Sequence, residues 1–147
     1  MISRAVEICL RHAREKHWDK VYWAIDIHGT ILKPNYKRNE ISTEFYPFAI
    51  ETLQLISKRN DIVLILYTCS YPHEIEQYMT LFADHSIQFD YVNQNPEIAN
   101  GGYGYYQDKF YFNVLMDDKA GFDGEHDWKE VLMVIQKFEK IKSEINN

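Results

Sequence analysis

Short apolar runs alternate with amphipathic segments along this chain of 147 residues. The runs at 21–25 and 62–67 contain no charged residue, which is typical of strands covered on both faces of a sheet. Further candidate strands lie at 87–92 and 112–116. Strands that alternate with helices indicate βαβ units. The sequence therefore predicts an α/β fold, a three-layer Rossmann-like domain with a mostly parallel central sheet and helices on both faces.

The segments between these runs carry apolar residues at helical spacing. Residues 3–17 form the first such segment, with Ser3 as the expected N-cap, and residues 45–59 form the second. A third helix is expected to begin at Pro72, because proline is favoured in the first turn of a helix. The apolar face of the last helix is predicted to comprise Trp128, Val131, Leu132, Ile135, Phe138 and Ile141.

Composition narrows the classes of function. The hydrophobic fraction of 46% is enough for a core, and we expect a single domain over residues 1–147. The net charge of -6 disfavours a general binder of nucleic acid or membrane surfaces, although a local basic site stays open. No stretch approaches the roughly 20 apolar residues that cross a bilayer. Cys9 and Cys69 show no disulfide-framework or zinc spacing, so we expect reduced thiols and a cytoplasmic location.

Polar side chains follow three of the predicted strands. Asp26, Thr68 and Asp117 each stand at the end of an apolar run. Because the carboxyl ends of parallel strands share one edge of a sheet, these residues are expected to converge on one crevice. Carboxylates gathered in this way repel one another unless a hard cation with oxygen ligands lies between them. The pattern therefore favours a Mg²⁺ site.

The same edge offers groups suited to a phosphate. Thr68 could supply a hydroxyl and neighbouring backbone N–H groups, and Lys109 could supply a positive charge. Asp26 could then be a carboxylate nucleophile that splits phosphoryl transfer into two steps. Simpler interpretations stay open. Asp26 and the acids at 117–118 could cap turns, Thr68 could cap a helix, and Lys109 could be an ordinary exposed lysine.

Four motifs of the chain, taken in order, resemble those of the haloacid dehalogenase (HAD) superfamily, a group of hydrolases dominated by Mg²⁺-dependent phosphatases. The first is the apolar strand followed by Asp26-Ile27-His28-Gly29-Thr30, where the family has D-x-D-G-T. The second is the strand that ends at Thr68, and the third is Lys109 before the fourth strand. The fourth is the strand that ends in Asp117-Asp118. Order and rough spacing agree over residues 21–123.

The resemblance implies a role for each acidic residue. Asp26 would be the nucleophile and a Mg²⁺ ligand, and His28 would lend its backbone carbonyl to the metal. Asp117 would lie nearer the metal, with Asp118 either a second ligand or an orienting residue. Asp123 is a less certain partner, because its loop varies across the family. The metal ligands expected from the resemblance are thus Asp26, His28, Asp117 and Asp118.

His28 departs from the family pattern. In the family's phosphatases an Asp at this position protonates the leaving oxygen and later activates water. An imidazole could act both as the acid that protonates the leaving oxygen and as the base that activates water, which would make Asp26 and His28 the catalytic pair. It could also bias the site towards a softer metal such as Zn, Fe or Ni, or be an inert turn residue. The chain is therefore predicted to be a phosphatase, with a catalytically impaired protein that binds phosphate or metal as the alternative.

The resemblance places Thr68 and Lys109 on the phosphate of a phosphorylated substrate whose identity the sequence does not give. Only about a dozen residues separate Thr30 from the second helix, and the loop at 93–108 is also short. Neither leaves room for the large cap domain that many family members insert. Capless members have open sites, and they often take bulky substrates or borrow a lid from a second subunit, which leaves a homo-oligomer open.

Overall fold

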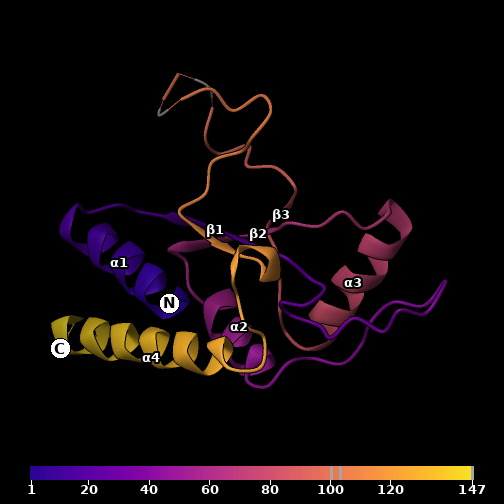
Figure 1. The fold of residues 1–147 in the computed structure, drawn as a ribbon. Coiled ribbons are helices and arrows are strands. Elements are labelled where there is room, and N and C mark those ends of the chain that lie inside the picture. Colours follow the sequence, from indigo (N-terminus) through magenta and orange to yellow (C-terminus); the bar gives the residue numbers. More distant parts are fainter. Residues whose placement is uncertain (100, 103, 147) are drawn as a thin grey trace.

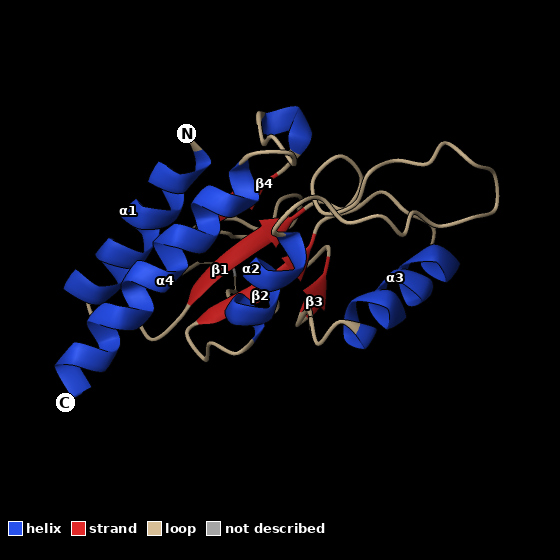
Figure 2. Ribbon diagram, turned by 90° about the horizontal axis from the view of Figure 1, so that it is seen from below, coloured by secondary structure: helices blue, strands red, loops and turns tan. Residues whose placement is uncertain are grey.

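The structure, a computed structural model, describes residues 1–99, 101–102 and 104–146, with the backbone alone over 140–146. A four-stranded, all-parallel sheet lies at its centre in the order β3-β2-β1-β4, and four helices flank it (Figures 1 and 2). The strands are β1 (Val21–Ile25), β2 (Ile62–Leu66), β3 (Tyr91–Val92) and β4 (Val114–Met116). The helices are α1 (Ile2–Glu15), α2 (Ala49–Ser57), α3 (Pro72–Asp84) and α4 (Asp127–Asn146), with a short 3₁₀ helix, η1 (Asp118–Ala120).

The predicted α/β class and parallel sheet are confirmed, and the sheet flanked by four helices is consistent with a Rossmann-like three-layer fold, although no described helix residue belongs to the apolar cluster on the second face. The two runs without charges became β1 and β2, and every residue in both strands is buried. β1 pairs with β2 from Val21↔Ile62 to Ile25↔Leu66. On its other side β1 pairs with β4, which brings Ile25 beside Met116. This register sets the ends of β1 and β4 next to each other.

Several predicted boundaries were wrong. β3 is shorter than the run 87–92, because Ile87 and Phe89 turn into the core before strand pairing begins at Tyr91. α2 begins at Ala49 rather than near 45, since Phe48 has a φ of 66° and cannot belong to a right-handed helix. Ser3 is not the N-cap of α1, which begins one residue earlier. The hydroxyl of Ser3 instead donates to Glu130 of α4 at 3.2 Å.

One hydrophobic core joins all four helices to one face of the sheet. Alternate strand residues point into it, as the period of two in a strand requires. Trp23 and Trp128 are its largest fully buried side chains. Besides Trp23, Leu64 and Met116 from the strands, the core includes Val6 of α1, Leu53 of α2, Phe82 of α3 and Trp128 of α4.

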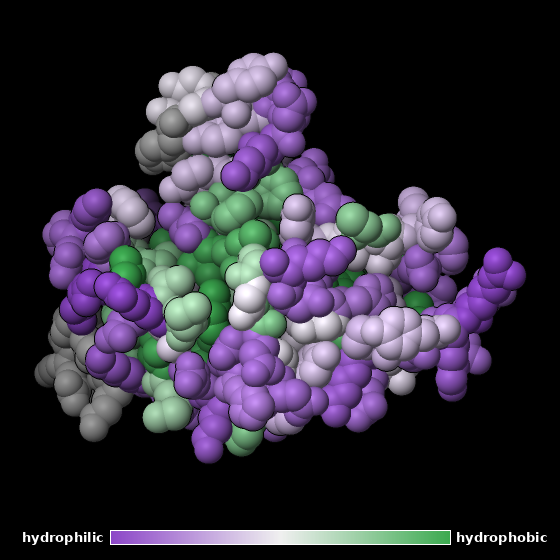
Figure 3. All heavy atoms as spheres, viewed as in Figure 1, coloured by the Kyte–Doolittle hydropathy of each residue, from purple (hydrophilic) through white to green (hydrophobic). Residues whose placement is uncertain are grey.

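Loop residues pack on the opposite face of the sheet. Figure 1 shows α2 and α4 below the sheet and the loop between β3 and β4 projecting above it. The buried members of the apolar cluster on this face are the strand residues Tyr22, Val63 and Ile65, and in the described part of the chain no helix residue joins this cluster. Figure 3 shows apolar residues gathered beneath the projecting loop, with polar residues around them. The partners of the cluster are Tyr91, Ile98, Phe110 and Tyr111.

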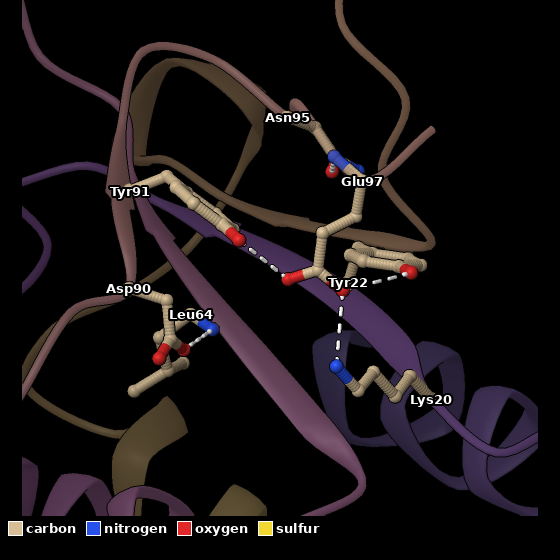
Figure 4. A network of polar contacts seen from close by, with 7 residues as sticks. All are labelled: Lys20, Tyr22, Leu64, Asp90, Tyr91, Asn95 and Glu97. Atoms are coloured by element: carbon tan, nitrogen blue, oxygen red, sulfur yellow. Dashed lines mark hydrogen bonds and ion pairs between the residues drawn. The ribbon is translucent and has the colours of Figure 1, made fainter. Parts of the chain in front are cut away.

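Glu97 fixes the start of this loop to the sheet (Figure 4). Its carboxylate accepts hydrogen bonds from the hydroxyl of Tyr91 at 2.8 Å and from Lys20 Nζ at 3.1 Å. The Tyr22 hydroxyl donates to the same carboxylate at 3.4 Å. Asn95, just before Glu97, donates to the carbonyl of Tyr111 at 2.9 Å and so ties the two ends of the loop together.

None of the described helices combines the length and the apolar character that a membrane-spanning helix requires.

Candidate metal centre and active site

Three aspartates meet at the carboxyl edge of the sheet. Asp26 directly follows β1 and Asp117 directly follows β4, and the N–H of Asp26 donates to the carbonyl of Met116 at 2.9 Å. Asp118 begins the 3₁₀ helix at the same edge. One carboxylate oxygen from each aspartate lies within 4.8 Å of the other two. Segments far apart in the sequence are thus brought to one point by the parallel pairing of β1 with β4.

The Gly29-Thr30 turn holds the aspartates in place. Gly29 has a φ of +80°, and a Cβ there would lie 2.5 Å from Oδ2 of Asp118, so only glycine fits. The Thr30 hydroxyl donates to Asp26 Oδ2 at 3.2 Å and accepts the N–H of Asp118 at 3.0 Å. Trp128 Nε1 in turn donates to the Thr30 carbonyl at 2.7 Å. The sequence pattern marked this turn, but it gave no sign that Trp128 anchors it.

The acids of this cluster are electrostatically unsatisfied. Burial, followed by the charge of Asp117, raises the pKa of Asp26 to about 7. Burial also raises the pKa of Asp117, although the backbone N–H of Lys119 donates to its carboxylate. A divalent cation would remove this repulsion, and carboxylate oxygens are the donors that Mg²⁺ prefers. The donor set of Asp26, Asp117 and Asp118 therefore fits the metal expected from the sequence.

His28 is held by a buried tyrosine. Its Nε2 lies 2.6 Å from the hydroxyl oxygen of Tyr78, and the two rings meet edge to face. The same oxygen accepts the backbone N–H of Ser42 at 3.1 Å. Burial lowers the pKa of His28 despite the nearby charges of Glu74 and Asp118. Tyr78 belongs to α3, and no sequence pattern indicated its contact with His28.

Thr68 lies in a tight turn between β2 and α3, and it is buried. Its N–H donates to Asn93 Oδ1 at 2.9 Å, and Asn93 Nδ2 donates back to the Thr68 carbonyl at 2.8 Å. The Thr68 hydroxyl lies 2.8 Å from that of Ser70 and accepts the Ser70 N–H at 3.1 Å. Asn93 thus positions the turn, a role that no sequence pattern indicated.

Five of the six predicted site residues line one open hollow of about 670 Å³. This acidic hollow is lined by Asp26, His28, Thr68, Asp117 and Asp118, together with Lys37, Lys119, Tyr36, Tyr67, Tyr71 and further residues of the same loops and of α3. The residue that it lacks is Lys109.

Lys109 lines a different hollow, of about 350 Å³, together with Asn93 and Tyr106. Its Nζ lies 5.9 Å from the centre of the Phe112 ring. The structure therefore does not bring Lys109 together with the aspartates, because the loop that carries it packs on the other face of the sheet. Asp123 is also absent from the residues that line the acidic hollow, and its carboxylate contacts His126 at 2.8 Å near the start of α4.

Comparison with known proteins adds information on the fold. No protein-family model matches the chain, and no curated protein matches it. The solved structure of a conserved protein from Bacteroides thetaiotaomicron is similar to it, with a TM-score of 0.60 and 24% sequence identity. The match covers 80% of this chain and 91% of that chain. At this level of identity the likeness shows the fold alone.

Proposed function

We propose that this protein is a Mg²⁺-dependent phosphatase of the HAD type, acting on phosphoric monoesters through an aspartyl-phosphate on Asp26. The convergence of Asp26, Asp117 and Asp118 at the carboxyl edge of a parallel sheet is the observation that carries the proposal. The Gly29-Thr30 turn, which fixes two of these carboxylates, and the Thr68 turn across the hollow support it. The motif order noted in the sequence gives the same assignment.

The reaction would proceed in two steps at Asp26. In the first, a carboxylate oxygen of Asp26 forms a bond to phosphorus while the bond from phosphorus to the organic oxygen breaks. In the second, water attacks the same phosphorus and the bond to Asp26 breaks, which releases phosphate and restores the carboxylate. A bound Mg²⁺ would neutralise the charges of the phosphate and the acids. Asp26, Asp117 and Asp118 are the side chains that would hold it.

Thr68 and a lysine would hold the phosphate. Thr68 and Ser70 line the acidic hollow, and their hydroxyls, which lie 2.8 Å apart, would be the donors to a phosphate. Of the lysines that line the hollow, Lys37 pairs with Glu40 at 3.7 Å, whereas Lys119 follows the metal-binding acids directly. We assign to Lys119 the charge that the sequence had led us to expect from Lys109.

His28 would serve as the base of the second step. A base at Nδ1 needs the ring proton on Nε2, where the Tyr78 oxygen lies within hydrogen-bond distance to accept it. A lowered pKa keeps the imidazole neutral and available as a base, but it leaves less of the protonated form that the first step needs as an acid. Esters with good leaving groups, such as aryl phosphates, should therefore react faster than alkyl phosphates.

The same contact favours the alternative, a protein that binds phosphate or metal without efficient turnover. If Tyr78 instead donates its hydroxyl proton to Nε2, the Nδ1 of His28 carries the proton and offers no lone pair. The imidazole would then be a structural part of the turn.

A cytoplasmic location and a homo-oligomer are the remaining parts of the proposal, and the two free thiols, Cys9 and Cys69, fit a reducing compartment.

Hydrolysis of p-nitrophenyl phosphate with and without Mg²⁺ tests the proposal. We expect activity that needs Mg²⁺ and is lost in Asp26→Asn, while it persists in the matched control Asp84→Asn, which changes an exposed acid at the end of α3. Absence of turnover with Mg²⁺, Mn²⁺, Zn²⁺ and Ni²⁺ between pH 5 and pH 9 would favour the binding protein.

A further inference from the structure

Exposed tyrosines surround the acidic hollow. In the described part of the chain, eight large apolar side chains are exposed, and three of them, Tyr36, Tyr67 and Tyr71, line this hollow. Tyr36 is 94% exposed, Tyr71 is 70% exposed and Tyr67 is 40% exposed. Scattered exposed apolar residues are ordinary, but a group around one polar hollow indicates a ligand surface.

The three rings come from separate elements and have different supports. Tyr67 follows β2, and its ring packs edge-on against Phe110 at 6.0 Å. Tyr71 caps α3, and its ring stacks on that of His73 with an interplanar angle of 13°. Tyr36 lies in the loop before α2 and has a φ of 56°, which is costly for a bulky side chain.

The loop that carries Tyr36 is anchored to the site. Asn35 donates to the carbonyl of Ile41 at 2.9 Å and accepts the N–H of Lys37 at 3.0 Å, which closes the loop on itself. The N–H of Ser42, further along, donates to Tyr78, the residue that contacts His28. The loop that carries Tyr36 and the proposed base, His28, therefore both contact Tyr78.

Aromatic rings exposed around an anion site fit one kind of ligand. Stacking of a base on an aromatic side chain contributes about 1–3 kcal/mol and needs only a flat π-face. Sugars and alkyl chains lack a π-face and can offer an aromatic side chain only C–H contacts. The hollow has about 670 Å³, within the range that takes ligands larger than phosphate itself. The hollow thus has two parts of different chemistry. Tyr36, Tyr67 and Tyr71 form an aromatic rim, and the aspartates and Thr68 form a polar floor.

Resting on the proposed function, we propose that the acidic hollow takes phosphoric monoesters whose organic part carries a flat aromatic ring system. The phosphate lies over Asp26, Asp117 and Asp118, and the ring stacks on Tyr36, Tyr67 and Tyr71. Nucleoside monophosphates and phosphotyrosine share this chemistry. The rim therefore determines specificity, while the aspartates perform the reaction.

The first test compares adenosine 5′-monophosphate with ribose 5-phosphate, which differ by the base alone. With Mg²⁺ present, we expect kcat/KM to be at least about tenfold higher for the nucleotide, the value of one stacked ring. Tyr36→Ala and Tyr71→Ala should abolish most of that ratio. Tyr105→Ala is the matched control, since Tyr105 is 72% exposed but is not among the residues that line the acidic hollow.

Phosphotyrosine and phosphoserine, as free amino acids, form the second pair. Because aryl esters are expected to react faster through their leaving group alone, this pair is compared by calorimetric binding to Asp26→Asn. A binding preference for phosphotyrosine over phosphoserine that exceeds the preference for the nucleotide over ribose 5-phosphate identifies a phenol ester as the ligand, and the reverse identifies a nucleotide. Equal kcat/KM for the nucleotide and ribose 5-phosphate, together with equal binding of phosphotyrosine and phosphoserine, would overturn the inference and leave the phosphatase intact.

Calorimetric binding to Asp26→Asn separates the two proposals. If no ester is hydrolysed by the parent, the proposed function fails, and binding then decides the inference alone. Adenosine 5′-monophosphate that binds at least about tenfold more tightly than ribose 5-phosphate, with the difference lost in the double variant carrying Tyr36→Ala and Tyr71→Ala, supports it. Equal binding of the two, or binding of neither, contradicts it.

Discussion

Asp26 and Glu97 are two partly shielded carboxylates on opposite parts of the sheet, and their surroundings are opposites. Glu97 accepts hydrogen bonds from Tyr91, Tyr22 and Lys20 (Figure 4). Burial alone would raise its pKa, but these donors lower it below the usual value. The Asp26 carboxylate accepts hydrogen bonds from the Thr30 hydroxyl and the backbone N–H of Ile27, and burial together with Asp117 still raises its pKa to about 7.

The difference distinguishes a structural acid from a functional one. The donors around Glu97 stabilise its charged form, and its carboxylate holds the loop between β3 and β4 on the sheet. Asp26 is placed beside two more acids at a cost to stability. Such a cost is typical of sites arranged for a ligand, since a stable fold alone would have no use for it. The predictions below test whether Asp26 and Glu97 behave as these opposite roles require.

The largest effect is expected from Asp26→Asn on turnover. The amide cannot attack phosphorus, so kcat for p-nitrophenyl phosphate should fall at least about 10³-fold. Glu97→Gln removes the carboxylate that accepts hydrogen bonds from Tyr91, Tyr22 and Lys20. This variant should change kcat by less than about twofold at a temperature where it is folded. Equal losses in the two variants, with circular dichroism unchanged, would show that the contrast has no functional meaning.

His28→Asp is expected to raise turnover. A carboxylate restores the acid and base of the family pattern, and general acid–base help is worth about 10²–10⁴-fold when the group is well placed. Because the new side chain is shorter than an imidazole, we expect a gain nearer about tenfold in kcat. Steady-state rates for an alkyl phosphate, which needs the acid most, give the clearest readout. A folded variant that is slower than the parent would show that His28 is itself the working group.

Lys119→Met and Lys109→Met test which lysine meets the phosphate. Lys119 lines the acidic hollow and Lys109 does not. Loss of a charge-assisted contact of about 1.5–3 kcal/mol would lower kcat/KM by roughly 10–100-fold in Lys119→Met. Lys109→Met should stay within about twofold of the parent. The opposite ranking would restore the assignment made from sequence order.

The residues of the candidate site were easier to predict from the sequence than the residues that hold them in place. Apolar runs without charges identified β1 and β2, and because parallel strands end at one edge, the meeting of Asp26 with Asp117 followed from strand order. Lys109 was misplaced because sequence order does not show on which face a loop packs. The long segment before β4 follows the aromatic side of the sheet, where Phe110 and Tyr111 are partly buried and pack against the cluster of Tyr22, Val63 and Ile65.

Side chains that act through a contact distant in sequence left no pattern to find. Asn93, which holds the Thr68 turn, lies after a two-residue strand, and Trp128, which anchors Thr30, looked like one more core position of a helix. Tyr78 is similar, because its helical spacing shows only that it is buried. A pattern predicts which face of an element is covered, but not which polar atom a buried hydroxyl or indole N–H meets.

The smallest effect is expected in the free energy of unfolding without metal. The change should have opposite signs when Asp26 and Glu97 are replaced by their amides. The folded pKa of Asp26 is about 7, above the ordinary 3.8, so the folded state binds the proton more tightly and is progressively penalised as pH rises from about 4 to about 7. Asp26→Asn should therefore be more stable than the parent by about 1–3 kcal/mol at pH 8, with the difference shrinking towards pH 4. Urea unfolding with EDTA present measures it.

Glu97→Gln should show the reverse. The lowered pKa of Glu97 means that its stabilisation is present above the ordinary 4.5 and is lost as pH falls through the folded value, so this variant should be less stable than the parent at pH 8. Adding Mg²⁺ should raise the Tm of the parent and of Glu97→Gln, and raise it less in Asp26→Asn, because a ligand stabilises only the state that binds it. If Mg²⁺ shifted all three proteins equally, the metal would bind away from Asp26, and the raised pKa there would reflect crowding among acids alone.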